Sequence, residues 1–313
     1  MIVAPEYKAL SWLVDQQIAH WPEHKKFLSN SFSGRDGELL KTCEMIAALV
    51  VKIASHVDGG LPQLCADYHF LCEDIVLPEE EFFRRNNRYR ITKFEEALRE
   101  VYNNSAFMSR YMNGLLLSDI FWDNHARAMH GYKTKFLDGL KPKASHLEIG
   151  PGHGLLLYIA ANHPNVATIA AWDVSPTSIA QTRRALDTFG ITRPVKLELQ
   201  SLFAAGAPAS DADRFDSIVI SEVLEHLEDP LAALRVLHER MKPGGRLWVH
   251  VPANSPAPDH IYLIRDPNES LDLVRQAGFK VVNHEFFPMS GATLEKSRKF
   301  QLAVSCTVVG ERS

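Results

Sequence analysis

The sequence has little of what marks disulfide-bonded, membrane-spanning or nucleic-acid-binding proteins. It has four cysteines, none in a CxxC pair, which favours buried, reduced thiols over a disulfide framework. No apolar run approaches the roughly 18 residues of a membrane span, and the opening stretch MIVAPEYKAL lacks the pattern of a secretory leader. The net charge is −4 and no long Lys/Arg run is present, so a basic face for nucleic acid is not expected. These absences predict a cytoplasmic protein with neither a membrane nor a nucleic-acid partner.

The first part of the chain has the pattern of helices. The stretch GELLKTCEMIAALVVKIASHV repeats apolar residues at helical spacing, for example at Leu39, Cys43, Ile46 and Val50. FMSRYMNGLLLSDIFWDNHARAMHGYKTKFLDGL predicts two more helices, and prolines stand where helices would start or break. We therefore expect an all-helical N-terminal domain over residues 1–140. This domain would bind substrate or act as a lid, and a homodimer through its helices is an open alternative.

Residues 141–313 alternate short β runs with helical runs. SHLEIG, VATIAAWDV, PVKLELQ, RFDSIVIS and GGRLWVHVP predict strands. Such alternation implies right-handed βαβ units and a parallel sheet. FKVVNHEFF and FQLAVSCTVVG follow each other without a sizeable helix, so an antiparallel pair should close one edge. The expected fold class is α/β: a Rossmann-like, doubly wound, seven-stranded sheet with an antiparallel last strand.

The stretch HLEIGPGHGLL places glycines in the first turn between strand and helix. Gly150, Gly152 and Gly154 form GxGxG, whereas the dinucleotide fingerprint is GxGxxG. Glu148 ends the strand before the turn, where a carboxylate suits a positively charged ligand better than a pyrophosphate. Asp173 ends the second strand, where an acid commonly holds ribose hydroxyls. S-adenosylmethionine fits these features, because it has a ribose, an ammonium and a sulfonium but no phosphate.

Four motifs extend this pattern over about residues 143–310: LEIGPGHG, WDVSP, FDSIVISEVLEHLEDP and MKPGGRLWVHVP. In this order and spacing they resemble the class I S-adenosylmethionine-dependent methyltransferase family. The resemblance implies the fold described above, S-adenosyl-L-methionine as cofactor, and methyl transfer. It also implies a set of cofactor-binding residues: around the methionine part Glu148, Gly150, Pro151, Gly152, Gly154, Ser221 and Glu222, at the ribose Asp173, and around the adenine Val174, Ser201, Leu202 and Leu227.

Two parts of the cofactor site depart from the family's pattern or extend it. Where the family often has an aspartate near the adenine amino group, this chain has Gln200 and Ser201. Tyr132 precedes the first strand and is expected to reach the cofactor from the helix before it.

The chemistry of methyl transfer leaves the need for a base open. The donor is already activated, so proximity supplies much of the acceleration, and a base helps only if the acceptor must lose a proton. Glu222, Glu225 and His226 form ExxEH, which would share one face of a helix. His226 and Glu222 are therefore catalytic candidates, with His250 on the fifth strand as a third. No metal is expected; a divalent ion held by Glu222, Glu225 and His226 is a weaker alternative, and a merely structural His226 is another.

Acceptor contacts are expected from two segments: Trp122 and His125 in FWDNHARAMHGY, and Asn254, Asp259, His260 and Tyr262 in the loop after the fifth strand. The favoured function is methyl transfer to a small molecule of biosynthesis, such as a secondary metabolite. A peptide or a carrier-protein-bound acceptor is the first alternative. A non-catalytic cofactor-binding partner subunit is a weaker one, and no constellation supports a nicotinamide dehydrogenase.

Overall fold

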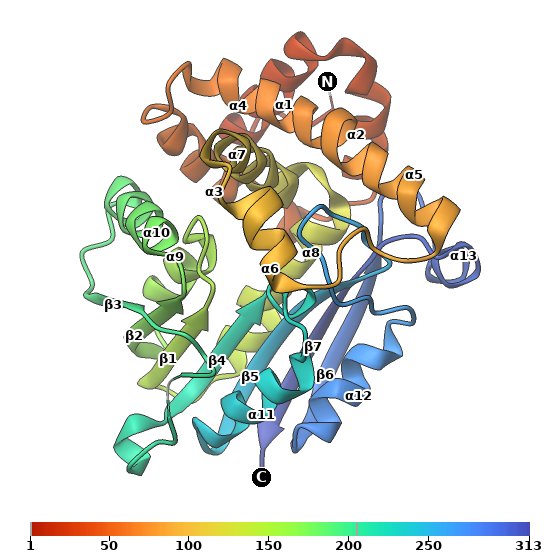
Figure 1. The fold of residues 1–313 in the computed structure, drawn as a ribbon. Helices are drawn as coiled ribbons and strands as arrows, with labels where there is room; N and C mark the ends of the chain where they lie inside the picture. The colour runs from red at the N-terminus through yellow and green to blue at the C-terminus, as the bar shows by residue number, and fades with distance from the viewer. Residues whose placement is uncertain (1, 205) are drawn as a thin grey trace. The chain divides into compact units, whose positions relative to one another are not determined.

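The computed structural model describes residues 2–204 and 206–313, and shows a helical first part followed by strands that alternate with helices (Figure 1). The helices are α1 (Lys8–His20), α2 (Lys25–Phe32), α3 (Gly37–Ala54), α4 (Gly60–Phe70), α5 (Leu77–Asn86), α6 (Phe94–Ala97), α7 (Ser105–Phe121), α8 (Asp123–Gly131), α9 (Leu155–Ala161), α10 (Pro176–Phe189), α11 (Pro230–Glu239), α12 (Asn268–Gln276) and α13 (Leu294–Phe300). The strands are β1 (Ala144–Ile149), β2 (Val166–Asp173), β3 (Val195–Leu199), β4 (Phe215–Ser221), β5 (Met241–Ala253), β6 (Phe279–Pro288) and β7 (Val304–Arg312). Short π-helical or 3-10 turns include η3 (Leu98–Tyr102), η4 (Tyr132–Phe136) and η7 (Leu224–His226).

The described chain divides into two compact units, each drawn from several segments. The helical unit comprises Met1–His130, Ser255–Leu263 and Phe287–Val304, and the sheet unit comprises Gly131–Asn254, Ile264–Phe286 and Ser305–Ser313. This division differs from the expected boundary at residues 140 and 141. The turn η4 belongs to the sheet unit because Tyr132 and Phe136 pack against Trp248 of β5, each with ring centroids 5.9 Å apart. Two segments of the second half belong to the helical unit, and the second of them contains α13.

Local sequence features explain how the helical unit is built. The Asp36 side chain accepts a hydrogen bond from the Leu39 backbone N–H at 2.9 Å and so caps the start of α3. Helices α4 and α7 pack at close range, because α7 has Gly114 at the crossing. A Cβ there would lie 2.7 Å from the Leu71 Cβ and 2.8 Å from the Asp67 carbonyl oxygen, so a larger residue would push the two segments apart.

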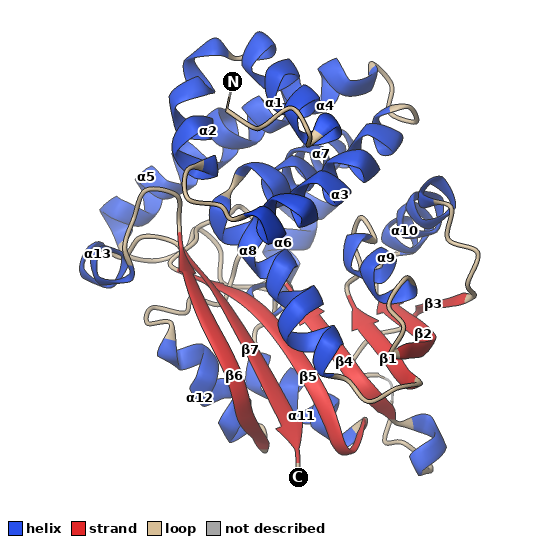
Figure 2. Ribbon diagram, turned by 180° about the vertical axis from the view of Figure 1, so that it is seen from behind, coloured by secondary structure: helices blue, strands red, loops and turns tan. Residues whose placement is uncertain are grey.

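In the sheet unit, the described strands form one seven-stranded sheet in the order β3-β2-β1-β4-β5-β7-β6 (Figure 2). Strands β1 to β5 pair in parallel, and β7 runs antiparallel, as the sequence predicts. The order reverses between β1 and β4, so their carboxyl ends border the crevice where ligands bind in sheets of this kind. The expected fold class is therefore confirmed.

Other expectations from composition can be compared with the structure directly. All four cysteines are free thiols; Cys43, Cys65 and Cys306 are buried, whereas Cys72 is only partly so. Burial raises the pKa of the Cys65 thiol to about 12, so it stays protonated near neutral pH. Within the described residues, none of the helices combines the length and the apolar character that crossing a membrane requires.

Candidate functional site

The turn from β1 into α9 is built from glycines in left-handed backbone conformations. Gly150, Gly152 and Gly154 have φ of 66°, 50° and 73°, a region that L-residues with a side chain rarely adopt. The Thr182 hydroxyl of α10 donates a hydrogen bond of 2.7 Å to the Gly152 carbonyl oxygen and so holds the middle of the turn. The turn therefore presents backbone rather than side chains at the carboxyl end of β1.

A side chain at position 150 would also collide with a neighbouring residue. A Cβ at this position would lie 2.7 Å from Cγ2 of Val223, which follows β4. At Gly154 the same atom would meet Leu186 and Thr182 only at 3.6 Å, an ordinary contact. Gly150 is thus required by both backbone and space, and Gly154 by its backbone conformation alone.

Glu148 lies beneath this turn as a buried carboxyl group. It is 2% exposed, and its Oε2 atom has no hydrogen-bond partner among the described residues. Burial raises the pKa of Glu148 well above its usual value, because it removes the hydration that stabilises the ionised form. A buried acceptor atom of this kind needs a donor or a cation that the chain itself does not supply.

Tyr132 and His146 lie in the same region of the sheet unit. The Tyr132 hydroxyl lies 3.3 Å from His146 Nε2, and His146 Nδ1 lies 2.6 Å from the Ser217 hydroxyl. Burial lowers the pKa of His146 to about 3, so its imidazole is neutral, and Glu148 adds to the effect of burial in raising the pKa of Tyr132. Tyr132 is thus fully buried in the core, and its expected contact with a cofactor stays a prediction.

Asp173 ends β2 and accepts two hydrogen bonds from its own chain. Its Oδ1 accepts from the Ser175 backbone N–H at 2.8 Å, and its Oδ2 accepts from the Ser178 hydroxyl at 2.6 Å. These bonds fix the carboxylate at the start of α10, whose N-cap is Ser175. Because an ionised carboxylate has about four lone-pair sites, it can still accept hydrogen bonds from a ligand.

Three exposed apolar side chains stand at or after the ends of β2 and β3. Val174, Leu199 and Phe203 are 61%, 60% and 55% exposed, and Leu199 is paired with Asp173 in the β2–β3 register. Large exposed apolar side chains at strand ends often mark a ligand surface. The sequence had indicated Val174 but not Leu199 or Phe203; the signal was present in LELQSLF, where two bulky apolar residues flank a strand end.

The residues after β3 that are expected near the adenine lie in different environments. Leu202 is buried, whereas Gln200 and Ser201 are partly exposed. The Gln200 backbone N–H donates to the Asp173 carbonyl oxygen at 2.8 Å, and its side-chain amide donates to the Ser201 carbonyl oxygen at 2.9 Å. The end of β3 is therefore tied to the end of β2.

Glu222 and His250 form a pair at the carboxyl ends of β4 and β5. His250 Nε2 lies 3.1 Å from Glu222 Oε1, which is an ion-pair distance, although the two groups are not aligned for a hydrogen bond. The other ring nitrogen of His250, Nδ1, lies 3.2 Å from the Ser221 hydroxyl. Glu222 has φ of 53°, a strained conformation for a residue other than glycine, and its N–H donates to the His250 carbonyl oxygen at 2.8 Å. Backbone strain at a strand end beside a carboxylate–imidazole pair is typical of a functional position.

The expected helical face of Glu222, Glu225 and His226 is wrong. Only Leu224–His226 form a short 3-10 turn, η7, and the left-handed conformation of Glu222 separates it from that turn. Glu225 is buried, and its Oε1 lies 3.9 Å from His226 Nε2. Leu227, which follows η7, is partly exposed. The roles of His226 as a base, and of these residues as metal ligands, stay predictions.

Trp122 and His125 belong to the helical unit and are engaged there. The Trp122 indole N–H donates to the Tyr68 hydroxyl at 3.1 Å, and its ring meets that of His125 edge-on at 4.9 Å. His125 Nδ1 lies 3.2 Å from the Ser118 hydroxyl. These contacts explain why the two residues are conformationally fixed, and their expected contact with an acceptor stays a prediction.

The four residues predicted in the loop after β5 fall into different units. Asn254 belongs to the sheet unit, where its side-chain amide donates to the Arg265 carbonyl oxygen at 2.6 Å. Asp259 and His260 are buried within the helical unit, and Tyr262 is half-buried. Their expected contacts with an acceptor likewise stay predictions.

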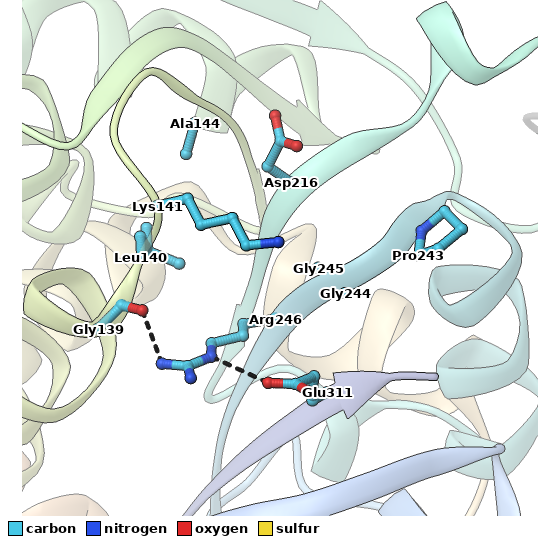
Figure 3. A pocket seen from close by; sticks show the side chains of 10 residues that line it. All are labelled: Gly139, Leu140, Lys141, Ala144, Asp216, Pro243, Gly244, Gly245, Arg246 and Glu311. Carbon is cyan, nitrogen blue, oxygen red and sulfur yellow. Dashed lines mark hydrogen bonds and ion pairs between the residues drawn. The ribbon is translucent and has the colours of Figure 1, made fainter.

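A separate hollow lies at the opposite end of the sheet (Figure 3). It is lined by residues near the amino ends of β1 and β4, among them Lys141, Ala144 and Asp216. Arg246 closes one side, donating to the Gly139 carbonyl oxygen at 2.7 Å and lying 3.4 Å from Glu311. The glycine turn and the Glu222–His250 pair lie at the carboxyl ends, so this hollow is not part of the candidate site.

Comparison with known proteins shows to which family the chain belongs. A methyltransferase-domain family model matches residues 121–296, more than half of the chain. The chain belongs to this methyltransferase family. The match covers β1 to β6 and thus the glycine turn, Asp173 and the Glu222–His250 pair.

Curated relatives match over a shorter region. A ubiquinone biosynthesis O-methyltransferase of Xanthomonas campestris pv. campestris is 34% identical over 150 residues, which are 45% of this chain and 59% of the relative. A protein of the same name from Xylella fastidiosa is 31% identical over 136 residues, 41% of this chain and 53% of the relative. The chain thus spans little more than half the length of these relatives.

Solved structures are similar only in part. An S-adenosylmethionine-dependent methyltransferase from Mesorhizobium loti is 17% identical, with a TM-score of 0.45, over 59% of this chain and 98% of that one. Similarity of this size says nothing about the substrate of this methyltransferase family member.

Proposed function

We propose that the protein is an S-adenosyl-L-methionine-dependent methyltransferase. The observation that carries the proposal is the buried carboxyl of Glu148, which has an unpartnered Oε2 beneath a turn whose glycines present only backbone. A ligand with a cationic group would stabilise the ionised form of this carboxyl, whereas a phosphate would not. When bound, S-adenosyl-L-methionine supplies a methyl group already activated on a positively charged sulfur.

The neighbouring residues fit the rest of that cofactor. Asp173 retains acceptor capacity for ribose hydroxyls, because its two internal hydrogen bonds leave lone pairs free. Val174, which follows it, and Leu199, which is paired with it, offer exposed apolar surface for an adenine ring, and Phe203 adds a third exposed apolar side chain after β3. Glu148 would serve the methionine end, Asp173 the ribose and these three side chains the base.

The acceptor is proposed to be a hydroxyl group of a small molecule. Two curated relatives carry names of O-methyltransferases of ubiquinone biosynthesis, and a hydroxyl must lose its proton as it is methylated. Glu222 is the more exposed member of the Glu222–His250 pair, with 34% of its side chain accessible against 7% for His250. Glu222 would accept the proton, and His250 would hold the carboxylate and share the proton.

The helical unit is proposed to select the acceptor. Trp122 and His125, which the sequence predicts to contact the acceptor, are held in place within this unit by hydrogen bonds to Tyr68 and Ser118. A peptide or carrier-bound acceptor would need a surface groove instead.

Binding and transfer can be measured separately. Isothermal titration with S-adenosylhomocysteine should show binding in about the micromolar range, corresponding to roughly −8 kcal/mol. Incubation with the methyl-labelled cofactor should then label catechol or another small phenol. Absence of S-adenosylhomocysteine binding would refute the proposal, and labelling of a peptide library but not of small phenols would move the acceptor to the peptide class.

Asp173→Ala is expected to weaken S-adenosylhomocysteine binding by about 1.5–3 kcal/mol, because the ribose hydroxyls lose a charged acceptor. Ser178→Ala is the matched control: it removes one internal bond to the same carboxylate but keeps the charge. Titration calorimetry of both variants would separate the two effects. If Ser178→Ala weakened binding as strongly as Asp173→Ala, local folding rather than ribose contact would explain the loss.

Glu148→Gln is expected to raise the free energy of unfolding of the ligand-free protein by about 1–3 kcal/mol near pH 8. Burial raises the pKa of Glu148, so the folded protein keeps this carboxyl neutral at pH values where the unfolded chain ionises it. The stabilisation is complete below the ordinary pKa of 4.5 and is lost as pH rises toward the raised value. Thermal unfolding between about pH 5 and pH 8 would measure this loss in the wild type and its absence in the variant. Parallel pH profiles would show that Glu148 is not held neutral.

A further inference from the structure

One face of α10 carries a row of side chains that reaches both parts of the proposed cofactor site. Ser178, Thr182 and Leu186 are spaced by four residues and therefore share this face. Thr182 and Leu186 are buried, at 0% and 3% exposed, and Ser178 is half-buried. The Ser178 hydroxyl bonds the Asp173 carboxylate, so the first member of the row already serves the ribose end of the site. All of these residues belong to the sheet unit.

The next two members of the row meet the glycine turn. The Thr182 hydroxyl donates to the Gly152 carbonyl oxygen at 2.7 Å. Thr182 Cγ2 and Leu186 Cδ2 each lie 3.6 Å from the place that a Cβ on Gly154 would take, so their apolar atoms pack close to the turn. Thr182 thus contacts the turn with both branches of its side chain, the hydroxyl and the methyl group.

The use of the Thr182 hydroxyl is unusual for a threonine inside a helix. Such a hydroxyl commonly bonds the carbonyl oxygen one turn earlier in its own helix. Thr188 of α10 does this, donating to the Arg184 carbonyl oxygen at 2.8 Å. Thr182 instead donates to a residue 30 positions earlier in the chain. Because a hydroxyl has a single donor, the Thr182 hydroxyl serves the turn and not its own helix.

The bond from Thr182 fixes a peptide group that the turn does not fix by itself. The Gly154 N–H donates to the Pro151 carbonyl oxygen at 2.8 Å, which holds the peptide group before Gly152. The peptide group after Gly152 has its carbonyl oxygen held by Thr182. In a planar trans peptide the N–H points opposite to the C=O, so this bond also sets the direction of the following N–H. Glycine has wide rotational freedom, so without this bond that peptide group could turn.

We propose that Thr182 is a positioning residue that holds the glycine turn in the shape that binds the methionine part of the cofactor. The inference rests on the proposed function. Without the Thr182 hydroxyl, the ligand would have to order the peptide group after Gly152 as it binds, and affinity would fall by the cost of that ordering. Asp173 is held by Ser178 and not by Thr182, so the ribose contact would be kept.

The first test measures binding of S-adenosylhomocysteine to variants of the full-length protein by titration calorimetry. Thr182→Val removes the hydroxyl but keeps the size of the side chain, and its dissociation constant should rise about five- to ten-fold. Thr182→Ser keeps the hydroxyl, and Thr188→Val removes a hydroxyl that bonds only within α10; both should stay within about two-fold of the wild type. Thermal unfolding checks each variant, and Thr182→Ala replaces the valine variant if that protein does not fold.

The second test asks which part of the ligand is affected. 5′-Methylthioadenosine has the adenosine and the sulfur but no amino-acid group. Measured by competition, its dissociation constant should stay within about two-fold in Thr182→Val, whereas Asp173→Ala should weaken both ligands. Hydrogen–deuterium exchange of peptides covering 150–156 should be about five-fold faster in Thr182→Val and unchanged in Thr188→Val.

Three results would overturn the positioning role of Thr182. They are unchanged S-adenosylhomocysteine affinity in Thr182→Val, equal losses of S-adenosylhomocysteine and 5′-methylthioadenosine, or a loss in Thr182→Ser as large as in Thr182→Val. Failure of the wild type to bind S-adenosylhomocysteine would instead refute the proposed function, and the role of Thr182 in cofactor binding would fall with it.

Discussion

Glu222→Gln is expected to lower kcat by about 10²–10⁴-fold, the usual contribution of a general base. Glutamine keeps the size of the side chain and tolerates the left-handed backbone about as well as glutamate does, so the change removes basicity rather than the turn. Single-turnover and steady-state rates with the methyl-labelled cofactor should both show the loss, while the dissociation constant of S-adenosylhomocysteine stays close to that of the wild type.

Glu311→Gln is a suitable control for this change. Glu311 has nearly the same side-chain exposure as Glu222, 35% against 34%, but pairs with Arg246 at the opposite end of the sheet. It should leave both kcat and S-adenosylhomocysteine binding unchanged. If Glu222→Gln kept full activity while His226→Ala lost it, the base would be His226, and the Glu222–His250 pair would serve only to shape the strand ends.

Gly150→Ala is expected to reduce S-adenosylhomocysteine affinity at least about ten-fold and to destabilise the fold by roughly 2–4 kcal/mol. The added Cβ is strained by the φ of 66° and would lie 2.7 Å from Val223 Cγ2. Relief of that contact moves either the glycine turn or the segment after β4, and both border the proposed cofactor site. Titration calorimetry and thermal unfolding measure the two effects.

Gly190→Ala separates strain from steric contact. Gly190 has φ of 78° at the end of α10, but a Cβ there would meet nothing within 4 Å. This variant should lose only about 1–2 kcal/mol of stability from backbone strain and should bind S-adenosylhomocysteine normally. Equal binding losses in the two alanine variants would show that general destabilisation, and not the shape of the turn, is responsible.

Much of the sheet unit could be predicted because its signals are local. A glycine turn, apolar runs of strand length and Gly190 at a helix end are each dictated by backbone sterics within a few residues. Glu148 and Asp173 were recognisable because each acid stands at or next to the last position of a strand. Leu199 and Phe203 were missed because a pattern of apolar residues does not reveal which of them are left exposed.

The prediction that Glu222, Glu225 and His226 share one face of a helix was wrong for a related reason. ExxEH has helical spacing, but Glu222 is the residue where β4 turns away, and its backbone is left-handed. The Glu222–His250 pair depends on β4 and β5 being neighbours in register, with Ser221 opposite His250. That adjacency comes from the order of the whole sheet.

By itself, the sequence determined the secondary structure of the sheet, the bare backbone of the first turn and the acids beside it, because these depend on steric rules along a few consecutive residues. Only the tertiary structure decided which distant segments complete a unit. Ser255–Leu263 belongs to the helical unit because its buried Asp259 needs hydrogen-bond donors, and Tyr102 and Tyr111 provide them from far away in the chain. A buried polar group needs hydrogen-bond partners, and no local sequence pattern indicates which distant residues provide them.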